Sequence, residues 1–77
     1  MFSVGLIQMG SRGKDVLLFE KIAKANGDYT GKLDGEYGNE CVKACKRVQK
    51  RAGFKDKDID GKCGPKTWPK VLGLQPI

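Results

Sequence analysis

Two short segments of the sequence repeat one pattern, an apolar residue followed by Asp, Gly, two further residues and a second Gly. The first lies within residues 32–38 and the second within residues 58–64, 26 positions later. An Asp side chain can accept hydrogen bonds from the amides that follow it, and Gly permits a positive φ. Tyr37 in the first segment and Cys63 in the second are expected to point inward. Because each segment leads into a helical pattern, the repeat predicts a duplicated loop–helix unit rather than a solenoid.

Three segments have the apolar spacing of helices, at about residues 13–26, 39–52 and 65–72. Each of the first two has a polar residue at its start that can cap a helix and a glycine after it that can end one. These are Ser11 and Gly27 for the first segment, and Asn39 and Gly53 for the second. No long run alternates as a strand would. The chain is therefore predicted to be all-α, a compact three-helix domain with structured Asp-Gly loops.

The second segment is the most clearly amphipathic of the three. Its apolar face carries Cys41, Ala44, Cys45, Val48 and Ala52, and its opposite face carries Lys43, Lys46, Arg47, Lys50 and Arg51. The apolar face is expected to join the core. The basic face has two interpretations, a solvated surface or an electrostatic attraction to an anionic polymer.

The third segment has two candidate starts. Pro65 can open a helix, but Pro69 would then remove a backbone hydrogen bond and clash with the carbonyl four residues earlier. A start capped by Thr67 places Pro69 in the first turn and avoids the clash. We favour that start, or a distorted first turn.

The length of 77 residues allows one domain, predicted to span residues 1–77 with an extended N-terminal segment at residues 1–9. A domain of this size buries only about 60% of its unfolded surface, so its core is thin and a deep active site is not expected. The sequence contains no His, which excludes Ser-His-Asp and Cys-His catalysis and the zinc sites that use His. The chain is not expected to be an enzyme.

The three cysteines, Cys41, Cys45 and Cys63, are predicted to be free buried thiols. An odd number cannot pair completely within one chain, and three cannot form a four-cysteine metal site. Cys41 and Cys45 lie one helical turn apart on the apolar face of their segment, where packing is the simplest role.

Residues 56–61 imitate the start of a calcium-binding loop, with Asp at every second position. Such a loop needs a bidentate acidic residue at its twelfth position, which here is Thr67. We therefore expect solvated loop charge, and neither a metal nor another cofactor. No apolar run approaches the ~20 residues of a membrane span, so no membrane contact is expected.

Several stretches of the sequence together resemble the three-helix peptidoglycan-binding domain of bacteria and phages. They are residues 10–16, residues 29–38, Val48 with Gln49, residues 60–68, and Val71 with Leu72. The second Asp-Gly loop is followed by Gly-Pro-x-Thr-Trp, and two such loops at this spacing make the resemblance specific. It covers about residues 6–74. It implies a non-catalytic wall-targeting module that directs an attached or associated hydrolase, of the endolysin, amidase or muramidase type, to peptidoglycan.

The sequence departs from the family pattern at two places. The first helix of the family usually contains Leu-Gln, where this chain has Phe19 and Glu20, and the first loop is often followed by Gly-Pro-x-Thr, where this chain has residues 38–41. The apolar pattern is preserved at these sites and at the cysteine positions. The fold is therefore expected to be that of the family, while the choice between glycan and stem peptide stays open.

The ligand is expected to lie in a shallow groove formed by the two Asp-Gly loops and the adjoining helix ends. The aspartates would fix the loops and accept hydrogen bonds, the basic residues would attract wall carboxylates, and the aromatic residues would supply apolar contact. The predicted binding residues are Tyr29, Asp34, Tyr37, Lys43, Arg47, Asp60 and Trp68. Tyr29, in a polar turn, is predicted to be the exposed aromatic platform, whereas Tyr37 and Trp68 also suit the core.

Two other classes of function remain open, a small basic nucleic-acid-binding protein and a regulatory or pro-domain module that docks on an enzyme. The net charge of +6 suits a nucleic acid as well as a wall, but the second helical segment offers few side chains for reading base edges. We expect a monomer that acts at the bacterial cell wall. The first seven residues lack the features of a signal peptide, which suggests synthesis in the cytoplasm with phage-type release, or an excised module.

Overall fold

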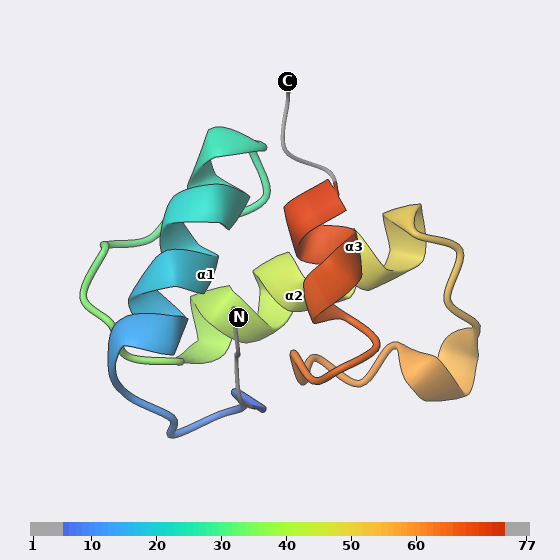
Figure 1. Cartoon of the computed structure of the whole chain (residues 1–77), viewed down its shortest axis with the longest axis horizontal. Helices are drawn as coiled ribbons and strands as arrows, with labels where there is room; N and C mark the ends of the chain where they lie inside the picture. Colours follow the sequence, from blue (N-terminus) through green and yellow to red (C-terminus); the bar gives the residue numbers. More distant parts are fainter. Residues whose placement is uncertain (1–5, 74–77) are drawn as a thin grey trace.

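The computed structural model describes residues 6–73, and in that part of the chain it contains helices and no strand. The elements are α1 (Lys14–Ala25), α2 (Asn39–Arg51), a short 3₁₀ helix η1 (Asp56–Asp58) and α3 (Trp68–Gly73). Each of the three α-helices contacts the other two, and Figure 1 shows α1 and α3 side by side. The prediction of an all-α three-helix domain is therefore confirmed.

The predicted N-caps are wrong. Gly13 and Gly38 flank the starts of α1 and α2, neither with a side-chain cap bond, and Asn39 is already helical. Ser11 lies two residues before the cap position, and its Oγ instead accepts a hydrogen bond from the amide of Gln8 at 3.0 Å. The predicted stops are correct, since Gly27 and Gly53 follow the C-caps of α1 and α2 with φ of 82° and 90°.

The third helix begins at Trp68, so the range 65–72 starts too early and the start at Thr67 is the correct alternative. Residues 65–67 form a turn in which the amides of Thr67 and Trp68 both donate to the carbonyl of Gly64, at 3.0 and 2.9 Å. Pro69 accordingly lies in the first turn of α3, where its missing N–H removes no helical hydrogen bond.

The core gathers the apolar faces of all three helices around a set of aromatic side chains. The ring of Phe19 in α1 lies 5.6 Å from that of Tyr37 and 6.2 Å, edge to face, from that of Trp68 (centroid distances). The three cysteines are free and buried, as predicted. The other buried apolar residues are Ile7, Val16, Ile22, Ala23, Tyr29, Ala44, Val48 and Val71.

The segment before α1 pairs with both Asp-Gly loops. Ile7 exchanges two backbone hydrogen bonds with Cys63, at 3.0 and 2.8 Å, and Gly10 donates to the carbonyl of Tyr37 at 3.0 Å. The chain turns at residues 8–11, where the amide of Ser11 donates to the carbonyl of Gln8 at 2.8 Å. Of the extended segment expected at residues 1–9, residues 1–5 lie outside the described part of the chain.

Candidate functional site

The two Asp-Gly segments fold into the same tight turn. We call residues 34–38 loop 1 and residues 60–64 loop 2. In loop 1, Oδ1 of Asp34 accepts a hydrogen bond from the amide of Glu36 at 3.0 Å, and in loop 2, Oδ1 of Asp60 accepts one from the amide of Lys62 at 2.9 Å. The glycine after each aspartate has a positive φ, of 71° and 73°. The duplicated loop predicted from the sequence is present.

A buried polar side chain from the preceding helix holds each turn. Oε1 of Glu20 in α1 accepts a hydrogen bond from the amide of Gly35 at 2.9 Å, and Oε1 of Gln49 in α2 accepts one from the amide of Gly61 at 3.1 Å. Both side chains are at most 1% exposed. Both residues stood at family motif positions in the sequence analysis, but neither was predicted to hold a loop, although a polar residue on an otherwise apolar helix face was a signal for it.

The two loops are joined through the core. The hydroxyl of Tyr37 donates to the carbonyl of Gly61 at 2.7 Å, so the inward residue of loop 1 contacts the turn of loop 2. Cys63, the inward residue of loop 2, is fully buried. The expectation that both residues point inward is confirmed, and a change in one loop is coupled to the other.

Replacing Gly61 by alanine is expected to destabilise the domain by about 2–4 kcal/mol. A Cβ there would lie 2.7 Å from Cγ1 of Val42 on α2, in addition to the strain of φ +73°. Gly27 is the matched control, because its φ is +82° and a Cβ there meets nothing within 4 Å. Urea denaturation measures the loss of stability in both variants. Gly27→Ala reports the backbone strain alone, and Gly61→Ala reports the strain and the steric clash together. Equal losses of stability would contradict the tight approach of loop 2 to α2.

The loop aspartates are held in their charged form. The amide of Glu36 lowers the pKa of Asp34 below its usual value. Burial acts to raise the pKa of Asp60, but hydrogen bonds from the Lys62 amide and from Gln49 outweigh it, and the net shift is downward. Both side chains are therefore carboxylates at neutral pH, able to accept but not to donate hydrogen bonds.

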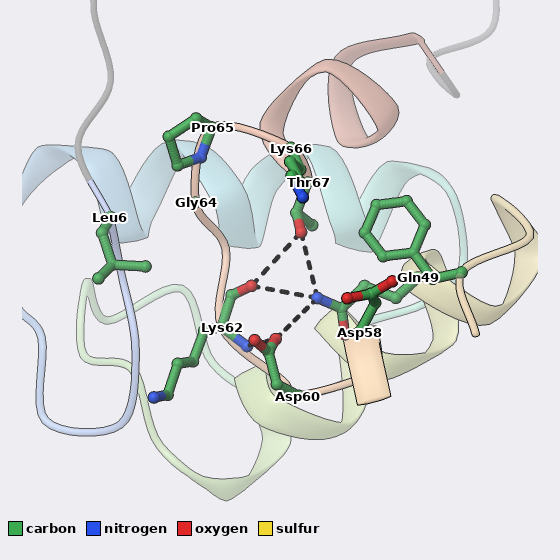
Figure 2. A pocket seen from close by; sticks show the side chains of 10 residues that line it. Leu6, Gln49, Asp58, Asp60, Lys62, Gly64, Pro65, Lys66 and Thr67 are labelled. Atoms are coloured by element: carbon green, nitrogen blue, oxygen red, sulfur yellow. Dashed lines mark hydrogen bonds between the residues drawn. The ribbon is translucent and has the colours of Figure 1, made fainter. Parts of the chain in front are cut away.

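A groove of about 330 Å³ lies against loop 2. Its wall includes exposed Leu6, whose Cδ1 would lie 3.3 Å from a Cβ at Gly64. Nε2 of Gln49 donates to Oδ1 of Asp60 (3.0 Å), the carbonyl of Lys62 (3.1 Å) and Oγ1 of Thr67 (3.1 Å), as Figure 2 shows. The lining residues are Leu6, Gln49, Phe54, Asp58, Asp60, Lys62, Gly64, Pro65, Lys66 and Thr67.

The structure does not bring the two loop aspartates into one groove. Asp60 lines the groove beside loop 2, whereas Asp34 lines two other hollows. One of these is shared with the start of α1 and the other with the start of α2. The single groove expected between the loops is therefore replaced by separate hollows, because Tyr37 and the core fill the space between the turns.

The expectation that Tyr29 is an exposed platform is wrong, since Tyr29 is only 5% exposed. Its hydroxyl lies within hydrogen-bond distance of Oε2 of Glu20 (3.1 Å) and of the carbonyl of Lys32, and these partners hold the ring inside. Tyr37 and Trp68, each 2% exposed, are core residues. The three aromatic side chains of the predicted site are therefore buried, and of these Tyr37 joins the two loops.

The two basic residues of the predicted site lie on the exposed face of α2, and both have partners on the protein. Lys43 pairs with Glu40 at 3.6 Å, and Nη1 of Arg47 donates to the carbonyl of Asp28 at 2.7 Å. Arg51 also pairs with the carboxylate of Asp28, which is buried. Arg47 and Arg51 thus fasten the turn after α1 to α2, a structural role that the sequence analysis did not assign.

With this geometry established, comparison with known proteins identifies the family. The model of the family described as "Putative peptidoglycan binding domain" matches residues 12–71, most of the chain and all of both loops. The chain belongs to this family. The resemblance seen in the sequence is confirmed, and the chain is a peptidoglycan-binding module related to those of cell-wall hydrolases.

Two relatives are spore cortex-lytic enzymes, from Bacillus cereus and from Bacillus subtilis. Each is 39% identical over 66 residues, which are 86% of this chain but only 24% and 21% of the relative. The chain thus spans about a quarter or less of the length of the curated relatives it matches. In both it corresponds to one part of a larger protein.

Two crystal structures have the same fold. The SleB N-terminal domain superposes with a TM-score of 0.84 at 36% identity, covering 95% of this chain and 96% of that one. The Burkholderia AP3 phage endolysin superposes with a TM-score of 0.79 at 28% identity, covering 95% of this chain and 27% of the endolysin. The similarity therefore extends over nearly the whole of this chain.

Two further features of residues 6–73 bear on the site. No three His, Cys, Asp or Glu side chains in this part of the chain are grouped so that they could hold a metal ion. None of its helices combines the length and the apolar composition that crossing a membrane requires.

Proposed function

We propose that this domain binds peptidoglycan without cleaving it, at the groove beside loop 2, and holds an associated cell-wall hydrolase at its substrate. The observation that carries the proposal is the construction of that groove. Its polar floor is fixed by one buried amide, that of Gln49, while its rim is open to solvent. A rigid surface of this kind binds a ligand at little cost in conformational entropy.

The chemistry of the groove supports binding rather than catalysis. Asp60 stays charged, so it is unsuited to act as a general acid near neutral pH. The hydroxyl of Thr67 is hydrogen-bonded to Gln49 and to the carbonyl of Lys62, neither of which is a base that could activate it. The sequence has no His to supply one.

The seven predicted binding residues take different parts in this proposal. Asp60 contacts the ligand directly, and exposed Lys43 and Arg47 add long-range attraction for wall carboxylates from α2. Asp34 fixes loop 1, Tyr37 joins the two loops, Tyr29 contacts the anchoring residue Glu20, and Trp68 packs on Phe19 in the core. Of the seven, only Lys43 is therefore expected to affect binding without affecting folding, because Arg47 also fastens the turn after α1 and Asp60 also fixes loop 2.

The affinity of one isolated domain is expected to be weak, with a Kd of about 1 μM to 1 mM, because the groove is small and open. A polymeric wall presents many copies of the ligand, so rebinding retains the domain. A linked catalytic domain would then stay close to its substrate. The spore cortex-lytic enzymes and the phage endolysin, each with further chain beyond the matching part, support this arrangement.

Co-sedimentation with purified insoluble sacculi tests the proposal. The domain is expected to pellet with sacculi over a range of salt concentrations and to leave a DNA fragment unshifted in a gel at moderate salt. Retention on DNA at moderate salt with no retention on sacculi would instead support the nucleic-acid alternative. Inhibition of a co-purifying hydrolase, without retention on sacculi, would support the regulatory alternative.

A further inference from the structure

We infer that the groove beside loop 2 recognises the stem peptide of peptidoglycan rather than its sugar chain; the inference rests on the proposed function and specifies its ligand. Four features of the described residues support this inference. They are the burial of the aromatic rings, the mixed charge of the rim, the size of the groove and the rigidity of its floor.

Sugar rings are commonly bound by stacking their apolar faces on exposed aromatic side chains. In residues 6–73 four of the five aromatic side chains cannot provide such a platform, because Phe19, Tyr29, Tyr37 and Trp68 are all at most 5% exposed. The remaining ring, that of Phe54, is half-buried and is one wall of the groove. A run of sugar rings would find a single aromatic contact here.

The rim of the groove carries charges of both signs. Asp58 and Asp60 supply carboxylates, and Lys62 and Lys66 supply ammonium groups. The glycan backbone of peptidoglycan is made of N-acetylated sugars whose one carboxyl group is consumed by the bond to the peptide. The stem peptide bears free carboxylates and, in many walls, a free amine, so a rim of mixed charge is complementary to the peptide.

The groove has room for a short peptide and an apolar surface to match. Its volume of about 330 Å³ is at the lower end of the ~300–1,000 Å³ typical of small-ligand sites. Leu6, Phe54 and Pro65 offer apolar contact for the methyl groups of alanine residues, which recur in stem peptides. A segment of two or three small residues therefore fits both its size and its lining.

The floor presents fixed acceptors suited to peptide amides. Gln49 holds Asp60, the Lys62 carbonyl and Thr67 in place. Both hydrogen bonds of the Asp60 carboxylate use Oδ1, so Oδ2 is engaged by neither of them. A preorganised carboxylate oxygen beside apolar walls is a natural acceptor for a backbone N–H.

Chemical-shift mapping with three soluble probes tests the inference, using the disaccharide alone, the stem peptide alone and the disaccharide–peptide. At about 10 mM, above the weakest expected Kd, the two peptide-containing probes are expected to shift the amides of Leu6, Lys62 and Thr67. The disaccharide alone is expected to leave them unchanged. Shifts at these amides with the disaccharide, or shifts confined to another face, would overturn the inference.

Charge-reversal variants provide a matched control. Lys62→Glu with Lys66→Glu is expected to weaken binding of the stem peptide about tenfold, because charged hydrogen bonds at the rim are lost. Lys21→Glu with Lys24→Glu changes the net charge equally at two exposed positions of α1 and is expected to change binding less than twofold. Equal losses of binding in the two double variants would show that the groove is not the binding site. Failure of the parent domain to pellet with sacculi would instead overturn the proposed function.

Discussion

Replacing Trp68 by alanine is expected to destabilise the domain by about 3–5 kcal/mol. The side chain is 2% exposed and lies edge-on against Phe19, so it joins α3 to α1. Removing a buried Trp costs about 3–5 kcal/mol. A domain of 77 residues is stabilised by only about 4–12 kcal/mol in total, at 0.05–0.15 kcal/mol per residue. One substitution therefore removes a large part of the stability.

The length of α3 increases this sensitivity. Six residues are far too few for a helix to persist by itself in water, so α3 depends on the contacts of Trp68 and Val71. Losing α3 would also release the turn at residues 65–67, which forms one side of the groove. Binding is thus expected to be lost together with the fold.

Far-UV circular dichroism with urea titration measures the effect. Leu72→Ala is the matched control, because Leu72 lies in the same helix and is 38% exposed, so its loss is expected to stay below about 1 kcal/mol. If Trp68→Ala unfolds at the same urea concentration as Leu72→Ala, the assignment of Trp68 to the centre of the core is wrong.

The sequence was most informative where structure is determined locally. The Asp side chain, the positive-φ glycine and the inward residue of each loop lie within five positions of one another, so a repeated pattern predicts a repeated turn. The helices and their glycine stops follow from the same short-range rules. Even the choice between two starts for α3 could be made from the chemistry of Pro69.

The anchoring bonds could not be predicted from local pattern. Glu20 reaches the amide of Gly35 across 15 positions, and Gln49 reaches that of Gly61 across 12. Periodicity shows only that each lies on an inward face. Which amide it meets depends on how the helices cross, and that is a property of the tertiary structure.

The exposure of Tyr29 was mispredicted because it, too, depends on partners that only the tertiary structure supplies. Tyr29 follows a polar turn and was expected outside, but Glu20 and the carbonyl of Lys32 provide partners for its hydroxyl within the protein. Arg47 lies on the exposed face of its helix as predicted, but its hydrogen bond to the carbonyl of Asp28 was not predicted. Amphipathic side chains such as these choose an environment according to the partners that folding supplies.

The second large effect is expected at high pH, where the domain should lose stability steeply. Burial raises the pKa of the Cys41 thiol from 9.0 to about 12, and burial also raises the pKa of the Tyr29 and Tyr37 hydroxyls. Above pH 9 the folded protein therefore retains protons that the unfolded chain releases. The free energy of unfolding falls as the pH rises, because deprotonation favours the unfolded state.

The size of the loss follows from the shift of Cys41. A displacement of three pH units corresponds to about 4 kcal/mol by pH 12, at ~1.4 kcal/mol per unit. The tyrosine hydroxyls add to it above pH 10. Against a total of about 4–12 kcal/mol, the shift of Cys41 alone is expected to remove about a third or more of the stability by pH 12.

Urea titrations at intervals between pH 7 and pH 11, with a reductant to keep the thiols free, measure the slope of stability against pH. Cys41→Ala lowers the stability at every pH because it leaves a cavity, so the slopes and not the levels are compared. Between pH 9.5 and pH 11 the slope of the variant is expected to be shallower by up to ~1.4 kcal/mol per pH unit. Parallel slopes would show that the Cys41 thiol ionises as readily in the folded protein as in the unfolded chain.

Asp60 provides the complementary control, because its pKa is shifted the other way. A carboxyl group whose pKa is lowered by folding adds stability above its unfolded pKa of 3.8, and that stability is lost as the pH falls through the folded value. Asp60→Asn is therefore expected to change the slope on the acid side and leave the alkaline slope as in the parent. The two substitutions together would assign part of the acid limb of the stability profile to Asp60 and part of the alkaline limb to the buried Cys41 thiol.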